Sequence, residues 1–159
     1  MEQLQAALHN PVLVAPIVGW CVAQILKVII HLCVTKSWNW ERFVGGGGMP
    51  SSHSATVGGL ATAAFLEFGP ASFEFAMATV FGIIVMYDAM NVRLETGKQS
   101  TIINMLIKNE DIKAKLDETG KDKWAEIILK EYVGHTPSQV LVGLILGILI
   151  GVGASYLLK

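Results

Sequence analysis

The feature that most constrains this chain is a long apolar stretch, Val12 to Val34, in which Lys27 is the one formal charge. As a helix it would be roughly 35 Å long, enough to cross the hydrocarbon core of a bilayer. Val140 to Leu158 is a second stretch of this kind. Two such stretches, in a chain with 52% hydrophobic and 16% charged residues, predict an integral membrane protein.

Two shorter apolar segments, Ser54 to Phe68 and Phe73 to Tyr87, lie between these stretches and are separated by Gly69-Pro70. A Gly-Pro pair is typical of a tight turn, so we expect a helical hairpin that crosses the membrane. At about fifteen residues, either segment could instead be a buried or re-entrant helix. The predicted fold is an all-α membrane bundle, one domain over residues 1–159, with about four transmembrane helices near residues 12–34, 52–68, 72–90 and 138–158.

The distribution of basic residues predicts the orientation. Lysines and arginines gather after the first predicted span and between the third and fourth, whereas the hairpin turn has none. The positive-inside rule therefore places these two loops in the cytoplasm and both termini outside. We expect a multi-pass protein of the cell membrane with its active face toward the cytoplasm. Within the cytoplasmic segment, residues 91–135, the mixture of apolar and charged residues indicates one or two amphipathic helices on the membrane surface, or a solvated hairpin.

The segment from Gly45 to Ser54, GGGGMPSSHS, joins a glycine run to a predicted helix start. Glycines let backbone N–H groups approach a ligand closely, and Pro50 presets φ for the first helical turn. An anion is stabilised at such a helix start. The segment predicts a phosphate site beside His53, with an ordinary linker and serine cap as the alternative. The predicted phosphate-binding residues here are Gly47, Gly48, Ser51 and Ser52.

Lys27 shares one face of the first predicted helix with Gln24 and His31. It lies roughly 10 Å inside the cytoplasmic end of that helix. An ionisable residue at this depth predicts a functional site. The alternative is snorkelling, in which the long stem returns the ammonium group to the interface.

Acidic residues mark the cytoplasmic end of the third predicted helix, where Asp88 and Glu95 share a face and Arg93 is displaced from it. Carboxylate oxygens are suitable ligands for Mg²⁺ that bridges to a substrate phosphate. Alternatively, Asp88 pairs with Arg93 or Lys27 and sets helix packing. The sequence does not separate these two interpretations.

His135 comes just before the last predicted helix, whose start is marked by a capping box of Thr136 and Gln139 with proline between them. A lone loop histidine is usually a surface residue, but here a second histidine-bearing helix start faces the same side as the first. Small residues recur every four positions in both helices, as Ala55, Gly59 and Ala63 and as Gly143, Gly147 and Gly151. Such faces let helix backbones approach closely, which would bring both histidines near Lys27.

Three motifs resemble the divergent branch of the type 2 phosphatidic acid phosphatase family, which is also described as acid phosphatase/vanadium haloperoxidase-related. They are Met49-Pro-Ser-Ser-His-Ser, Asp88-Ala with Val92-Arg93 and Gly97, and Gly134-His-Thr-Pro with Val140 and Gly143. The resemblance covers nearly the whole chain. In the main family the motif Pro-Ser-Gly-His holds the phosphate through its serine and backbone amides, and its histidine is the general acid. Pro50, Ser51 and His53 match that motif, with Ser52 in place of its glycine.

The resemblance also has departures. Lys27 matches the lysine of the family's first motif, but no Arg-Pro follows at the family spacing, so that Arg42 or Arg93 would stand in. If Ser138-Gln139 is aligned with the third motif, the nucleophilic histidine and its aspartate fall on Ile145 and Leu149. The nucleophile is therefore His135, or else a metal-activated water held by Asp88 and Glu95 acts in its place.

The resemblance implies a phosphatase that hydrolyses a lipid phosphate monoester, such as phosphatidylglycerophosphate or phosphatidate, at the cytoplasmic leaflet. Lys27 and Arg93 would neutralise the phosphoryl oxygens, His135 would attack, and His53 would protonate the leaving oxygen, with the two histidines interchangeable. This route requires no cofactor, whereas the alternative requires Mg²⁺. The expected partners are the lipid phosphate and the membrane, with no nucleic acid. The alternative functions are a non-catalytic protein that binds or transports a lipid or isoprenyl phosphate and, less favoured, a Mg²⁺-dependent transferase.

Overall fold

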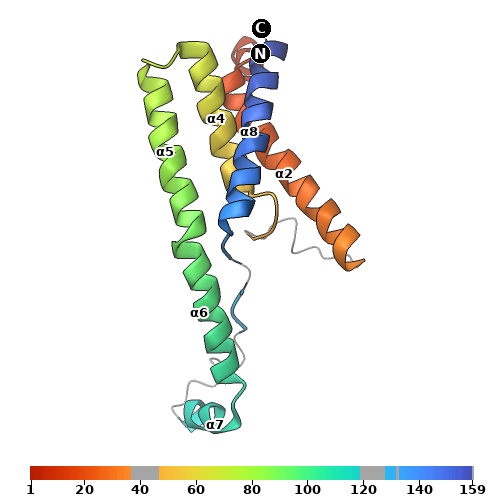
Figure 1. The fold of residues 1–159 in the computed structure, drawn as a ribbon, viewed down its shortest axis with the longest axis vertical. Coiled ribbons are helices and arrows are strands. Elements are labelled where there is room, and N and C mark those ends of the chain that lie inside the picture. The colour runs from red at the N-terminus through yellow and green to blue at the C-terminus, as the bar shows by residue number, and fades with distance from the viewer. Residues whose placement is uncertain (37–46, 119–127, 132, 159) are drawn as a thin grey trace.

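The computed structural model describes residues 1–36, 47–118, 128–131 and 133–158. All regular elements within these ranges are helices, which confirms the predicted all-α fold (Figure 1). They are α1 (Glu2–Leu8), α2 (Pro11–Thr35), α4 (Ser52–Phe68), α5 (Phe73–Met90), α6 (Val92–Ile107), α7 (Glu110–Glu118) and α8 (Pro137–Leu157).

Within the described residues, three helices are long and apolar enough to cross a membrane: α2, the nearly continuous pair α5 and α6, and α8. The fourth helix of the bundle, α4, has 17 residues and is about 25 Å long. It lies at the centre and packs against α2, α5 and α8. The chain is thus a multi-pass membrane protein built around a short central helix.

Small residues allow α4 to be surrounded so closely. A Cβ atom on Gly147 of α8 would lie 2.8 Å from the backbone nitrogen of Gly59, and one on Gly19 of α2 would lie 2.8 Å from the carbonyl oxygen of Ala55. No side chain fits at such positions, so the helices meet backbone to backbone. The predicted small-residue faces are confirmed, and each meets the other directly.

Both termini and the turn between α4 and α5 lie at one end of the bundle (Figure 1). The opposite end, here called the site end, holds the starts of α4 and α8 and the junction of α5 with α6. Successive helices α2, α4, α5 and α8 therefore run in alternating directions between the two ends, in the order expected from the sequence (Figure 1). The turn itself is made by Gly69, whose φ of 85° lies in the left-handed region, and by Ser72, which caps α5.

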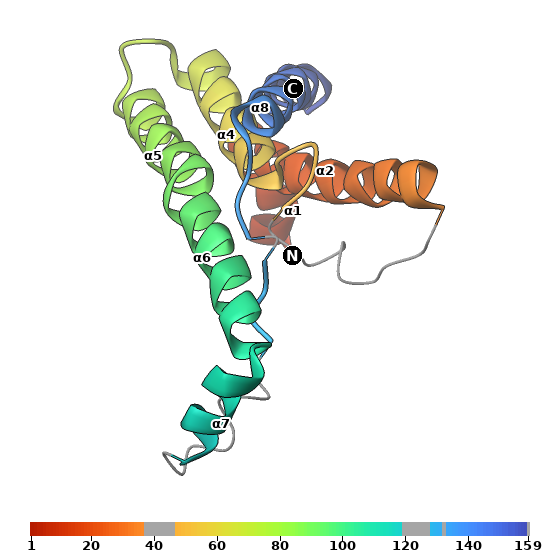
Figure 2. The same ribbon diagram turned by 60° about the horizontal axis from the view of Figure 1, so that its bottom comes forward.

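The helix α6 continues the direction of α5 beyond the site end, and α7 lies at its far end (Figures 1 and 2). The junction residue Asn91 keeps right-handed helical backbone angles, so the axis passes through it with little change in direction. Of the two alternatives expected for this segment, amphipathic helices on the membrane surface and a solvated hairpin, the first does not describe α6, which projects along the axis of the bundle (Figures 1 and 2). Residues 119–127 of the predicted amphipathic segment lie outside the described residues.

Candidate functional site

The side chain of His135 lies at the centre of the site end and is completely buried, with 0% exposure. Its Nδ1 is 3.2 Å from Oε1 of Gln139, and its Nε2 is 3.4 Å from Nδ1 of His53. The ring also interacts with the backbone of Gly48. Burial lowers the pKa of His135 to about 4, so its imidazole is neutral near pH 7.

The position of His135 depends on the segment that leads back to α8 alongside α6 (Figure 1). At the far end of this segment, the side-chain amide of Asn104 donates to the carbonyl of Leu129 and accepts from its N–H, at 2.9 and 3.0 Å. At the near end, a Cβ on Gly134 would collide with the backbone of Leu94. The backbone N–H of His135 then donates to the carbonyl of Ala89 at 3.0 Å. These contacts fix His135 against the end of α5.

His53 enters the site from the first turn of α4 and is half-buried. Its ring meets that of His135 edge to face, with ring centroids 5.5 Å apart. The charges of Arg93, Lys27 and Asp88 are close enough to act on it. The structure therefore brings together both predicted histidines, although they lie 82 positions apart in sequence.

Lys27 reaches the same site from α2 and is only 2% exposed. Its ammonium group donates to Oε1 of Gln24 at 2.7 Å, one turn deeper in the helix. Its stem packs on Gly48, where a Cβ would lie 3.1 Å from Cγ of the lysine. Gly48 has a φ of 100°, which favours glycine, so the loop can close over the lysine only with this residue. The ammonium is held inside the protein, and the snorkelling alternative does not describe it.

The acidic residues predicted as possible Mg²⁺ ligands each form an ion pair. Oδ2 of Asp88 accepts from Nε of Arg93 at 2.5 Å, and Oε1 of Glu95 accepts from Nζ of Lys98 at 2.6 Å. Both pairs are exposed, with side-chain exposures between 39% and 60%. Among the described residues, no group of three His, Cys, Asp or Glu side chains is arranged to hold a metal ion. The pairing of Asp88 with Arg93 is one of the two arrangements expected from the sequence.

Ser51 caps α4. Its Oγ accepts from the backbone N–H of Ser54 at 3.3 Å, and the residue is fully buried. Its own N–H donates to the carbonyl of Gln139 at 3.0 Å, which ties the starts of α4 and α8 together. Ser52 is 4% exposed, and Gly47 is buried beside Gly48. The role of these residues in binding phosphate stays a prediction, and the first two glycines of the run and Arg42 lie outside the described residues.

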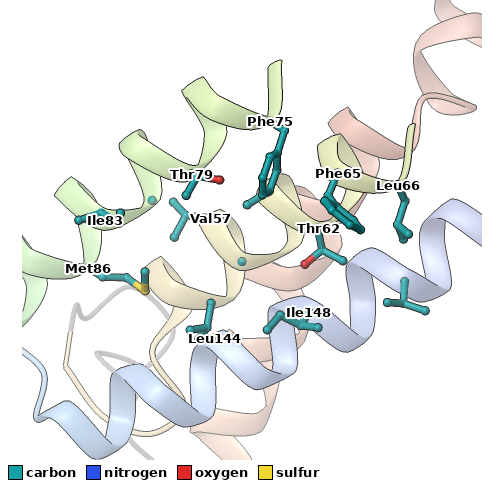
Figure 3. Close-up of a pocket in the computed structure, with 14 residues that line it drawn as sticks. Val57, Thr62, Phe65, Leu66, Phe75, Thr79, Ile83, Met86, Leu144 and Ile148 are labelled. Carbon is teal, nitrogen blue, oxygen red and sulfur yellow. The ribbon is translucent and has the colours of Figure 1, made fainter. Parts of the chain in front are cut away.

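An apolar groove of about 480 Å³ runs along α4 between α5 and α8 (Figure 3). Val57 is one helical turn from His53 on the same face of α4 and marks the near end of the groove. Phe65 and Phe75 line the other end, where their rings meet edge to face. Groove residues such as Ile83 and Ile148 remain exposed, so the groove opens toward the lipid side of the bundle.

Sequence reasoning found Gln139 only as part of a capping box and assigned it no role at the histidines. The available signal was its spacing of four from His135, which lets one side chain serve both the helix cap and the imidazole. The positions aligned with the family's nucleophile and aspartate, Ile145 and Leu149, are 50% and 64% exposed on the outside of α8. These two positions lie in the third and fourth turns of α8, away from the histidine at its start.

Comparison with known proteins agrees with the motifs. A family model described as "Divergent PAP2 family" matches residues 8–150. The uncharacterized membrane protein YuiD of Bacillus subtilis (strain 168) is 37% identical over 152 residues, which cover 94% of this chain and 96% of that protein. No solved structure matches the chain.

Proposed function

This chain belongs to the divergent PAP2 family of membrane proteins, and from that premise we propose that it is a phosphatase that hydrolyses the phosphate monoester of a membrane lipid. The observation that carries the proposal is the pairing of His53 with His135 at the starts of α4 and α8, where the charge of Lys27 acts on both rings and an apolar groove begins one helical turn from His53. The site thus combines a buried cation, a histidine pair and an apolar channel.

The charges support a phosphate ligand. Most of the catalysis of phosphoryl transfer comes from stabilising charge on the phosphoryl oxygens, and a buried ammonium does this better than an exposed one. Lys27 supplies the buried charge, and Arg93 supplies an exposed one beside His53. Gly47, Gly48 and Ser52 would complete the phosphate site at the start of α4. On this route the reaction requires no cofactor.

The groove supports a lipid as the source of the phosphate. A phosphate held at His53 would place the adjoining hydrocarbon chain over Val57 and along α4. The basic loops at the site end favour a substrate of the cytoplasmic leaflet. Phosphatidylglycerophosphate and phosphatidate are the substrates that we propose.

Phosphate release by the purified protein in detergent tests the proposal. We expect release from phosphatidylglycerophosphate or phosphatidate that persists in EDTA. Release that requires Mg²⁺ would transfer the chemistry to a metal held by Asp88. Tight binding of these lipids or of an isoprenyl phosphate without any release would overturn the enzyme and favour a lipid-phosphate binding protein.

Replacing Lys27 with methionine is expected to lower the rate of phosphate release by about a hundredfold, because the variant loses a buried charge on the phosphoryl group. The measurement is kcat and KM with phosphatidate in mixed micelles. Lys98→Met is the matched control, since Lys98 is exposed and paired with Glu95 outside the site. Equal rates for the two variants would contradict the assigned role of Lys27.

Filling the groove is expected to separate lipid substrates from soluble ones. Ala61 lines the groove, and Ala61→Phe is expected to lower kcat/KM for a long-chain phosphatidate by about tenfold. Hydrolysis of p-nitrophenyl phosphate, which has no chain, is expected to change little. Ala76→Phe on the exposed face of α5 adds the same bulk outside the groove and serves as the control. A parallel loss with both substrates would mean that the groove does not hold the lipid chain.

A further inference from the structure

The donor and acceptor roles of the hydrogen bonds around the two histidines can be assigned one after another, starting from the backbone N–H of Thr136. That group can only donate, and its acceptor at 3.2 Å is Oε1 of Gln139. The amide of Gln139 is thereby oriented with its oxygen toward the site. Nδ1 of His135 lies 3.2 Å from the same oxygen, which can only accept, so the network favours the tautomer in which Nδ1 carries the proton and donates it.

A neutral imidazole carries one proton, so Nε2 of His135 has a free lone pair when Nδ1 is protonated. Nδ1 of His53 lies 3.4 Å from that lone pair, and donation of its own proton satisfies it. The chain of donors therefore runs from His53 through His135 to Gln139. It leaves Nε2 of His53 unprotonated.

The geometry also decides which histidine can reach a substrate. His135 has no exposed surface, whereas His53 is partly open. A phosphoryl group with its three oxygens does not fit between two ring nitrogens in hydrogen-bond contact, so the histidines cannot act on opposite sides of the same phosphorus. Only one histidine can therefore contact the phosphoryl group, and the other contacts that histidine from the side away from the substrate.

We infer that Nε2 of His53 is the atom that attacks phosphorus, and that His135 and Gln139 are positioning residues behind it. This inference rests on the proposed phosphatase activity and selects, of the two interchangeable assignments left open by the sequence, the one in which His53 attacks. Gln139 orients His135, and His135 orients His53 and accepts its Nδ1 proton in a hydrogen bond. The arrangement follows the logic of a nucleophile, an orienting base and a third group that holds the base.

The reaction balances without another reactant besides water. The lone pair on Nε2 of His53 forms a bond to phosphorus of the monoanionic ester, and the bond from phosphorus to the ester oxygen breaks. That oxygen leaves as the alcohol with the proton that the phosphate monoanion carried. The resulting phosphoimidazolium keeps its Nδ1 proton on the hydrogen bond to His135. Water then attacks phosphorus, the N–P bond breaks, and dihydrogen phosphate leaves with both protons of the water.

Two variants of His135 distinguish a positioning residue from a nucleophile. His135→Gln keeps a side-chain oxygen that can accept from His53, whereas His135→Ala removes the acceptor. With phosphatidate, we expect His135→Gln to stay within about tenfold of the parent rate and His135→Ala to fall by about a hundredfold. Equal and complete loss in both variants, with folding intact by circular dichroism, would overturn the inference.

The attacking atom can be identified directly by quenching the reaction with ³²P-labelled phosphatidate in alkali and mapping the labelled peptide. We expect phosphohistidine on His53, substituted at Nε2. Label on His135, substitution at Nδ1, or turnover without any phosphohistidine would each overturn the assignment.

Nitrogen-15 NMR of the ligand-free protein near neutral pH separates this inference from the proposed function. We expect both His53 and His135 to be protonated at Nδ1 and not at Nε2, with signals assigned from the alanine variants and with His9 as an exposed reference. These tautomers without phosphatase activity would contradict the proposed function and leave the hydrogen-bond direction standing. Activity with a protonated Nε2 on His53 would contradict the inference alone.

Discussion

Replacing His53 with alanine is expected to lower phosphate release from phosphatidate by at least about a thousandfold, since the variant loses the attacking nitrogen. The buried charge of Lys27 and the groove remain in the variant, so lipid binding is expected to stay within a few-fold of the parent. Phosphate release and binding to lipid-containing micelles are measured on the same preparation. The pattern of lost turnover with retained binding is what a nucleophile produces.

His9→Ala is the matched control, because His9 lies on an exposed turn near the N-terminus, where its ring contacts only the backbone of Gln5 among the described interactions. It is expected to keep the parent rate. Added imidazole is expected to restore part of the rate of His53→Ala, since a small base can occupy the space that the ring leaves. Retained activity in His53→Ala would remove this histidine from the chemistry.

Gly147→Val is expected to destabilise the bundle by at least about 3 kcal/mol, the upper part of the usual range for an overpacked core. The new Cβ would collide with the carbonyl oxygen of Ala55 and lie 2.8 Å from the backbone nitrogen of Gly59. Backbone atoms of a central helix cannot move aside as a flexible side chain can, so α8 would have to separate from α4. The starts of both helices carry the site histidines, so activity is expected to disappear as well.

The midpoint of thermal denaturation in detergent measures this effect, with size-exclusion chromatography to report aggregation. Gly153→Val on the same helix is the control, because a Cβ there meets nothing within 4 Å. It carries the same change in composition and helix propensity. Similar midpoints for the two variants would show that close contact of α4 with α8 contributes little to stability.

The four helices of the bundle, α2, α4, α5 and α8, were largely predictable because the start of each carries a local capping signal. The predicted bounds 52–68 and 72–90 agree with those of the helices α4 and α5 to within a residue, since Ser51 and Ser72 cap these helices and Gly69 ends the first. The capping box likewise located the start of α8. The direction of α6 was not predictable, because it depends on backbone angles at Asn91 that many sequences adopt.

The residues of the candidate site could be predicted from the sequence, whereas the hydrogen bonds that join them could not. The sequence indicates Lys27 because an ionisable residue at membrane depth is uncommon, and His53 and His135 because two helix starts that carry a histidine are expected on the same side of the membrane. The arrangement of these side chains in space depends on contacts between distant segments, such as that of Asn104 with Leu129, 25 positions apart. It also depends on Gln139, whose side chain both caps α8 and contacts His135. No local pattern encodes which of two histidines is buried behind the other.

The sideways opening of the groove between α5 and α8 affects how such a protein would meet its substrate. A lipid can enter by lateral diffusion, with its hydrocarbon chain remaining in an apolar surrounding throughout. The encounter is then two-dimensional, so the relevant concentration is the mole fraction of the lipid in the membrane and not its amount per volume. Diluting the substrate with inert lipid or detergent would slow the reaction even when the bulk concentration is unchanged.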